Sequence, residues 1–225
     1  MRIGTLGAGS MAEALTTRWA GQGHEVMIGA RHPEKGAALA GRLGPGATSG
    51  GFAEAAAFGE AVLVAVHAEA AVEVLEAAGA REGALRGRTL IDCTNAIVPG
   101  RFTLGAPMAE LIAEATPGAH VVKAFNLCHV DVWRLTPPVF DGVPLGVPLC
   151  GDDPGALAAV RTLIADLGCV PLPGGPLERA PLLEATAALA IGLWLGEGAD
   201  ARSALPPLSH AGIEDGGQPP VPGSR

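Results

Sequence analysis

The stretch "RIGTLGAGSMAEAL", residues 2–15, places a Gly7-x-Gly9-x-x-Ala12 pattern between a short apolar run and the start of an amphipathic segment. A second apolar run, residues 25–29, follows about 20 residues later, as a dinucleotide-binding βαβ unit requires. In such a unit Gly7 allows the tight turn, Gly9 lets a pyrophosphate approach the backbone, and Ala12 lets the helix pack closely on the sheet. The stretch therefore predicts a nucleotide-binding turn, with a purely structural turn as the alternative.

The residues after the second apolar run indicate which dinucleotide is bound. An NAD site usually has an acidic residue there, which binds the ribose 2'-hydroxyl group. This chain instead has Arg31, His32 and, a turn later, Lys35. A cationic cluster suits a 2'-phosphate, which a guanidinium can bind through two hydrogen bonds. We therefore expect NADP(H) as the cofactor; the alternative is that Arg31 and Lys35 are solvated surface charges.

Short apolar runs alternate with amphipathic segments along the first 150 residues, which predicts an α/β fold. The expected architecture is a Rossmann-type, doubly wound parallel sheet. Strands are expected over residues 2–7, 25–29, 61–66, 88–93, 119–125 and 145–150, and helices over 11–22, 33–43, 68–79 and 107–116.

The rest of the chain predicts a small C-terminal α/β appendage. A helix should begin at Pro154, capped by Asp152 or Asp153, and a short strand "CVPLP" should follow it. An almost wholly apolar final helix, residues 176–196, must then be buried in the core or in a subunit interface. We divide the chain into an NADP-binding domain, residues 1–150, a C-terminal domain, 151–204, and a Pro- and Gly-rich tail, 205–225, expected to be disordered.

Composition narrows the classes of partner. The formal net charge is −8, no basic stripe is present, and Tyr is absent, so nucleic acid is not expected as a partner. The chain has neither a run of about 18 uncharged apolar residues nor a recognisable signal peptide, which favours a cytoplasmic protein without membrane contact. The four cysteines form no C-x-x-C pair, so no metal site is expected.

Beyond these patterns, the chain resembles the NADP oxidoreductases that depend on the 8-hydroxy-5-deazaflavin coenzyme F420. The resemblance covers residues 1–198 and implies a dimeric protein in which hydride passes between NADPH and the deazaflavin. It is carried, in family order, by "IGTLGAGSMAEAL", "GHEVMIGARHPEK", "LIDCTNAIVPG", "VVKAFN", "PLCGDD" and "LGCVPLPGGPLERAPLLE".

The residues and the resemblance together define a candidate site. His67, at the end of a strand, has a side chain able to donate a proton or hold the cofactor ribose, and the amide of Asn126 suits the nicotinamide carboxamide. The predicted catalytic residues are His67, Asn126 and Cys128. The predicted cofactor-binding residues are Gly7, Gly9, Ser10, Met11, Ala12, Arg31, His32, Lys35, His67, Asn95 and Asn126. The resemblance places the second-substrate pocket at Leu127, Cys128, Gly174, Gly175, Pro176 and Leu177. His129, which stands near them in the sequence, is added to this pocket, with a helix-start or surface role as the alternative.

Two departures from the family pattern lie beside the pocket for the second substrate. The chain reads "VHAEAA" where such proteins commonly have "VP" and an aromatic residue, and Ala96 stands where proline is usual. The identity of the hydride acceptor therefore stays open at this point. The alternatives to F420 are a small ketone, imine or enone, or a non-catalytic protein that senses NADP(H).

Overall fold

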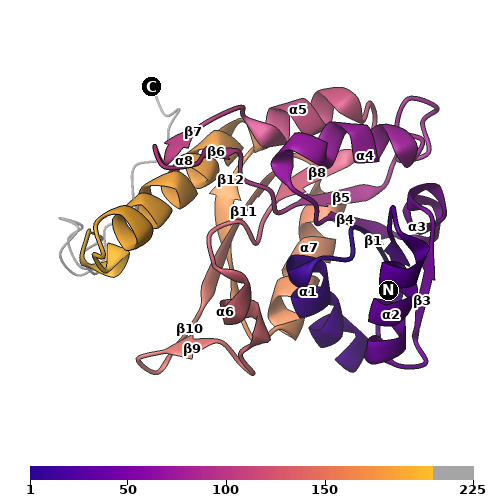
Figure 1. Cartoon of the computed structure of the whole chain (residues 1–225), viewed down its shortest axis with the longest axis horizontal. Helices are drawn as coiled ribbons and strands as arrows, with labels where there is room; N and C mark the ends of the chain where they lie inside the picture. Colours follow the sequence, from indigo (N-terminus) through magenta and orange to yellow (C-terminus); the bar gives the residue numbers. More distant parts are fainter. Residues whose placement is uncertain (205–225) are drawn as a thin grey trace.

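The computed structural model describes residues 1–204, which are built around one eight-stranded sheet (Figure 1). The strand order is β12-β11-β8-β5-β4-β1-β2-β3, and every neighbouring pair is parallel except β11 with β8. This topology confirms the predicted Rossmann-type α/β fold. The strands are β1 (Arg2–Leu6), β2 (Glu25–Gly29), β3 (Ala47–Gly50), β4 (Ala61–Val64), β5 (Thr89–Asp92), β8 (His120–Lys123), β11 (Gly146–Gly151) and β12 (Val170–Gly175).

Helices cover both faces of this sheet, and each face has its own apolar core. Alternate side chains of one strand enter different cores, as Ile3 and Leu6 of β1 do. One core joins the sheet to α1 (Ser10–Gly21), α2 (Pro33–Leu43), α6 (Val130–Arg134) and α7 (Pro154–Asp166). The other core joins it to α3 (Phe52–Phe58), α4 (Ala71–Ala77) and α5 (Met108–Ala115).

Short elements connect these parts. Two small antiparallel pairs are β6 (Ile97–Val98) with β7 (Thr103–Leu104), and β9 (Val139–Phe140) with β10 (Val143–Pro144). Short helical turns are η1 (Ala68–Ala70), η2 (Leu177–Arg179) and η4 (Ala201–Ala204).

The sequence pattern does not indicate β3 and α3. Thr48 and Ser49 of β3 are exposed at the edge of the sheet, so the strand has no apolar alternation that could reveal it. The predicted elements over 2–7, 25–29 and 33–43 are all present, with ends that differ by a residue at most.

The C-terminal part continues the same sheet. The predicted boundary at residue 150 falls inside β11, and β12 pairs with β11 as the edge strand, so the residues after 150 extend the Rossmann sheet. Asp153 caps α7, since its Oδ1 accepts the N–H of Ala156 at 2.7 Å, whereas Asp152 Oδ1 accepts the N–H of Leu177 at 2.9 Å. The predicted disordered tail, 205–225, lies outside the described residues.

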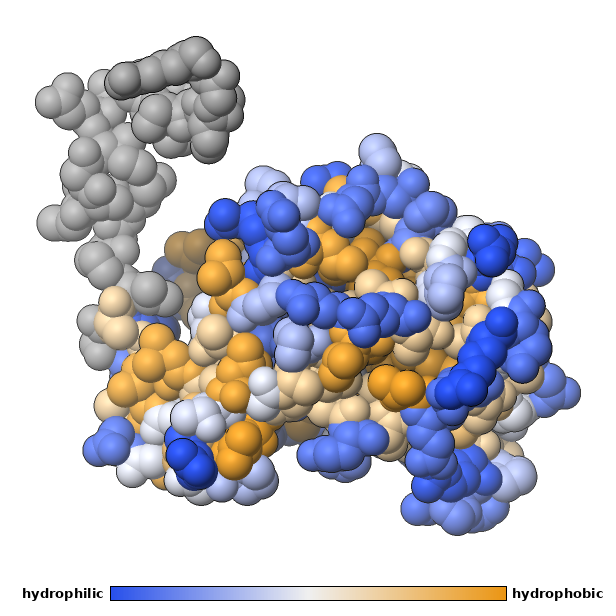
Figure 2. Space-filling view, turned by 90° about the horizontal axis from the view of Figure 1, so that it is seen from above, coloured by the Kyte–Doolittle hydropathy of each residue, from blue (hydrophilic) through white to orange (hydrophobic). Residues whose placement is uncertain are grey.

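The final apolar segment forms α8 (Ala180–Ile191) and a π-helical turn, η3 (Gly192–Gly196). Only one face of α8 is buried in the chain's own core, and Leu182 and Leu189 on the other face are 55% and 62% exposed. Figure 2 shows apolar side chains gathered at the left of the molecule, the end at which α8 and η3 lie in Figure 1.

Candidate functional site

A cavity of about 930 Å³ opens at the carboxyl edge of the sheet. Segments that follow β1, β2, β4, β5 and β8 line it, because the carboxyl ends of parallel strands meet at one edge. The structure brings together in this lining most of the predicted site residues: Gly7, Gly9, Ser10, Met11, Arg31, His32, Lys35, His67, Asn95, Asn126, Leu127, Cys128 and His129.

The glycine turn after β1 has two glycines with different roles. Gly7 has a φ of +120°, which favours glycine, and a Cβ there would collide with the carbonyl oxygen of Ala65, the residue after β4. The fold itself therefore needs this glycine. A Cβ on Gly9 would meet no atom of the described residues within 4 Å, although Gly9 lines the cavity. Gly9 thus leaves space for a ligand at the N-terminus of α1, where free backbone N–H groups suit a pyrophosphate.

Ala12 has the packing role that the sequence predicts. Its side chain is fully buried on α1, in the core between that helix and the sheet. Ala12 is not among the residues that line the cavity, so its contribution to the site is to let α1 lie close to β1.

The cationic cluster lies at the end of the cavity beyond β2. Arg31, His32 and Lys35 all line it, and the Arg31 side chain is 57% exposed. Its Nη2 is 2.8 Å from Oε1 of Glu73, a residue of α4 that sequence reasoning did not single out. The Glu73 carboxylate therefore holds the guanidinium at the cavity edge and would compete with an incoming phosphate for it.

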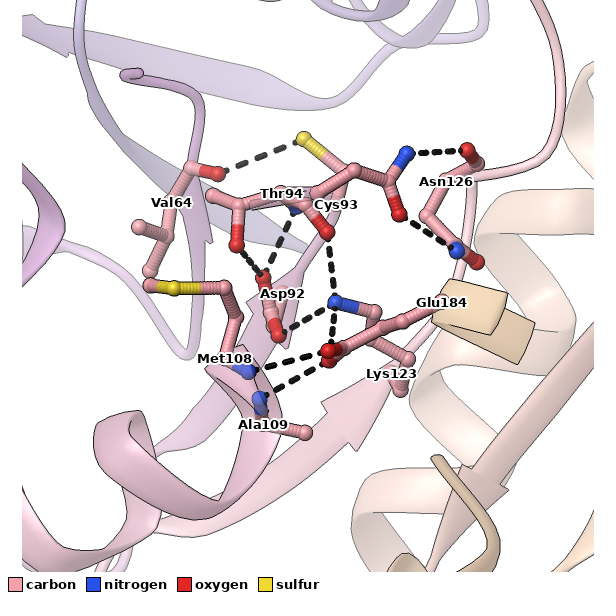
Figure 3. A network of polar contacts seen from close by, with 10 residues as sticks. Val64, Asp92, Cys93, Thr94, Met108, Ala109, Lys123, Asn126 and Glu184 are labelled. Atoms are coloured by element: carbon pink, nitrogen blue, oxygen red, sulfur yellow. Dashed lines mark hydrogen bonds and ion pairs between the residues drawn. The ribbon is translucent and has the colours of Figure 1, made fainter. Parts of the chain in front are cut away.

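Two asparagines meet at the other end of the cavity, after β5 and β8 (Figure 3). Asn95 Nδ2 donates to the main-chain oxygen of Asn126 at 2.6 Å, and Asn126 Nδ2 donates to Asn95 Oδ1 at 3.0 Å. Because a main-chain carbonyl can only accept, these contacts determine the orientation of both amides. Asn126 Oδ1 is left without a hydrogen-bond partner in the described chain, at a residue that is only 5% exposed. A buried acceptor of this kind needs a donor, which a ligand in the cavity would supply.

The backbone just before Asn126 turns sharply. Phe125 has a φ of +63°, a conformation uncommon for a bulky residue, and its side chain is 1% exposed. Its ring makes edge-to-face contacts with Trp19 and Trp133, at centroid distances of 5.8 and 5.5 Å. This aromatic packing holds the left-handed turn that ends β8 and directs Asn126 toward Asn95.

The thiols in the lining stay protonated at neutral pH. Burial raises the pKa of Cys128 to about 11 and, together with the nearby Asp92 charge, the pKa of Cys93 to about 12. The Cys93 thiol donates a hydrogen bond to the oxygen of Val64, with Sγ and oxygen 3.3 Å apart. Since the thiolate is the nucleophilic form, a role for Cys128 in the chemistry would be confined to contact with the reacting rings.

The two histidines of the lining differ in their contacts. His67 follows β4, is exposed and occupies the N-cap position of η1. His129 caps α6: its Nδ1 accepts the N–H of Asp131 at 3.4 Å and lies 3.2 Å from Asp131 Oδ2. His129 therefore has a structural partner, whereas His67 stands at the cavity edge with its side chain open to solvent.

The structure does not bring Gly174, Gly175, Pro176 and Leu177 to the described lining of the cavity. The N–H of Leu177 is bound by Asp152, and its side chain packs against the core beneath α5 and α8. Ile191, Trp194 and Leu195 of α8 and η3 form the cavity wall in their place. The sequence signal for this wall is the apolar run of the final helix, which predicts burial but not the surface that it covers.

Comparisons with known proteins found relatives by sequence and by structure. Residues 2–96 match the family model described as "NADP oxidoreductase coenzyme F420-dependent". The chain is 32% identical over 185 residues to metalloreductase STEAP3 of Rattus norvegicus, covering 82% of this chain and 36% of that protein. The chain thus spans about a third of the length of the curated relatives that it matches.

Solved structures share the fold over most of the chain. A protein from Arthrobacter sp. FB24, provisionally named an F420-dependent NADP reductase, has a TM-score of 0.75 and 28% identity over 88% of this chain and 95% of its own. The hypothetical protein SMa0349 of Sinorhizobium meliloti has a TM-score of 0.67 and 25% identity, over 80% and 86% of the two chains. A reductive aminase of Aspergillus terreus, at 20% identity and a TM-score of 0.63, covers 88% of this chain and 62% of its own and shares the fold.

These matches confirm the predicted resemblance to F420-dependent NADP oxidoreductases over residues 2–96, and they support NADP(H) as the cofactor. Within residues 1–204 no helix has both the length and the apolar character needed to cross a bilayer.

Proposed function

We propose, taking residues 2–96 as the NADP-binding part of an NADP oxidoreductase, that the chain transfers hydride between NADP(H) and the deazaflavin coenzyme F420. The observation that carries the proposal is that one cavity joins the glycine turn and Arg31 to the unpartnered oxygen of Asn126 and then to the apolar wall of η3. The family model and the Arthrobacter structure support F420 as the second partner.

Different residues of the cavity bind different parts of the cofactor. The backbone of residues 7–11 binds the pyrophosphate, and Arg31 with His32 and Lys35 binds the 2'-phosphate. His67 lies where the ribose next to nicotinamide would pass. Asn126 Oδ1 accepts a hydrogen bond from the carboxamide of nicotinamide, which gives this unpartnered buried oxygen a donor and sets the ring's orientation.

The opposite wall suits a flat, largely apolar acceptor. Ile191 and Trp194 face the same cavity as Leu127 and Cys128, and none of these side chains carries a charge. NADPH supplies the hydride when bound. Transfer to a second ring needs placement at van der Waals distance and exclusion of water more than it needs an acid or base. In this scheme Asn126 orients the donor ring, Cys128 contacts the rings as a neutral thiol, and His67 contacts the ribose.

The test is turnover of F420 by the purified protein. With NADPH in excess, we expect the visible absorbance band of oxidised F420 to disappear in a reaction that needs the protein. Asn126→Ala should lower kcat/KM about tenfold, the effect of losing one orienting hydrogen bond in a closed site. Gln22→Ala is the matched control, because it removes an exposed amide at the far end of α1 and should leave the rate unchanged.

Other outcomes would favour the alternatives. If F420 is not reduced while a ketone, imine or enone consumes NADPH, the acceptor is a small organic substrate. If NADPH binds tightly and no acceptor is turned over, the chain is a sensor of NADP(H), and a protein partner retained in only one redox state of the nucleotide would support that role.

As the oligomeric state we propose a homodimer formed through the outer face of α8. This face exposes Leu182 and Leu189, by 55% and 62%, and a second copy would remove these apolar side chains from water. Light scattering should give twice the mass of the chain, and Leu189→Arg should give a monomer. A monomeric mass for the unaltered protein would refute the dimer. A cytoplasmic location stays a prediction.

A further inference from the structure

Lys123, Asp92 and Glu184 form a buried ion cluster next to Thr94, a residue of the cavity lining; Figure 3 shows the contacts of this cluster. Lys123 of β8 is fully buried, and its Nζ is 2.9 Å from Asp92 Oδ2, 2.8 Å from Glu184 Oε1 and 2.6 Å from the oxygen of Thr94. The three hydrogens of the ammonium group therefore each have an acceptor. The side chains of Asp92 and Glu184 are likewise fully buried, so one cation is shared by two carboxylates without solvent.

Donors from a second element offset the extra negative charge. Glu184 Oε2 accepts the N–H of Met108 at 2.9 Å, and its Oε1 accepts the N–H of Ala109 at 3.0 Å. These are the first two residues of α5, whose N-terminal end carries partial positive charge. Among the described residues, the polar groups bound to the Glu184 carboxylate are thus all hydrogen-bond donors, which suits a side chain that only accepts.

Through Asp92, the cluster holds part of the cavity lining in place. Asp92 Oδ1 accepts both the N–H and the hydroxyl group of Thr94, at 2.8 and 2.7 Å. Thr94 lines the cavity, and the next residue, Asn95, binds Asn126. The position of the asparagine pair therefore depends on Asp92 and Lys123.

Through Glu184, the cluster also holds α8, the helix that leads to the apolar cavity wall formed by Ile191, Trp194 and Leu195. Glu184 lies on the buried face of α8, and Ile191, seven residues further on, ends that helix and lines the cavity. Seven residues are two helical turns, about 10 Å, across which a helix is rigid. The outer face of α8 is exposed to solvent. On its buried face, the Glu184 carboxylate binds Lys123 of β8 and so links this helix to the sheet.

We propose that Glu184 is a positioning residue for the hydride acceptor. By binding Lys123 and the N-terminus of α5, it sets the distance between the wall formed by Ile191 and Trp194 and the nicotinamide end formed by Asn95 and Asn126. The proposal rests on the proposed function, since it assumes that this wall contacts the acceptor. Buried ion pairs add little net stability compared with apolar packing, so a role in geometry is a reason for such a cluster to be present.

Glu184→Gln tests this role. The amide NH₂ group would face only donors, so the contact between α8 and the cluster should loosen while the helix keeps its shape. The NADPH-binding groups at residues 7–11 and 31–35 are on other elements, so the Kd for NADPH should change by no more than about twofold. The KM for F420 should rise at least about tenfold, with a smaller change in kcat.

Tryptophan fluorescence gives a readout that needs no turnover. Trp19 and Trp133 are buried, whereas Trp194 is 40% exposed, so quenching by acrylamide reports mainly on Trp194. In Glu184→Gln the quenching constant should rise, because the wall that carries Trp194 is less firmly held. Glu178→Gln is the matched control: the same substitution at an exposed carboxylate of η2, expected to change neither the KM nor the quenching.

An unchanged KM and unchanged quenching in Glu184→Gln would overturn the proposal, as would equal increases in the Kd for NADPH and the KM for F420. If the unaltered protein does not reduce F420 but the quenching still rises in Glu184→Gln, the role of Glu184 in holding the cavity wall is supported, and F420 is refuted as the acceptor. If thermal melting shows that Glu184→Gln does not fold, Glu184→Asp, which keeps the charge and shortens the side chain, should raise the KM and the quenching in the same direction, and no change would refute the role.

Discussion

Replacing Lys123 by Met is expected to lower the free energy of unfolding by about 3–5 kcal/mol. The substitution keeps the apolar stem of the side chain but removes the cation between Asp92 and Glu184, which have no exposure to water. Two buried carboxylates would then face each other without a counter-charge, and the Thr94 oxygen would lose its donor. A loss of this size is a large part of the stability of a typical domain.

Urea denaturation followed by circular dichroism measures this effect. Lys35→Met is the matched control, since it is the same substitution at an exposed lysine on α2 and should change the stability by less than about 0.5 kcal/mol. A loss below about 1 kcal/mol for Lys123→Met would contradict the view that the cluster holds two charged carboxylates.

Arg31→Ala is expected to weaken NADPH binding by about 1.5–3 kcal/mol, or roughly 10- to 150-fold, and to leave NADH binding nearly unchanged. The reason is that charge-assisted hydrogen bonds from the guanidinium to the 2'-phosphate exist only for NADPH. Calorimetric titration with both nucleotides gives the two dissociation constants, and equal losses would show that Arg31 does not recognise the 2'-phosphate.

Two further variants make this measurement specific. Glu73→Gln removes the carboxylate that binds Arg31 in the structure, so NADPH should bind up to about threefold more tightly, the small effect expected of an exposed ion pair. Arg81→Ala removes an exposed guanidinium that pairs with Glu76 away from the cavity, and it should affect neither nucleotide.

The sequence by itself determined the nucleotide-binding half of the protein. The Gly7-x-Gly9-x-x-Ala12 turn and the cationic residues after β2 are short segments whose roles depend on local backbone geometry and on neighbours close in the chain. The short apolar runs likewise predict most strands of the sheet. A short apolar run between turn residues is typical of a buried strand, and the amphipathic segments between the runs are typical of helices. The polar edge strand β3 lacks such a period and was not predicted.

Only the tertiary structure decided the acceptor side. The pairing of Asn95 with Asn126 and of Lys123 with Glu184 joins residues that are far apart in the chain. It depends on β5 and β8 lying side by side and on α8 bringing Glu184 to Lys123. The resemblance placed residues 174–177 in the pocket, but the described cavity lining does not include them, and Ile191 of α8 and Trp194 of η3 line it instead. Local patterns specify how a segment folds and which face it buries; which distant segment meets that face is decided by the packing of the whole chain.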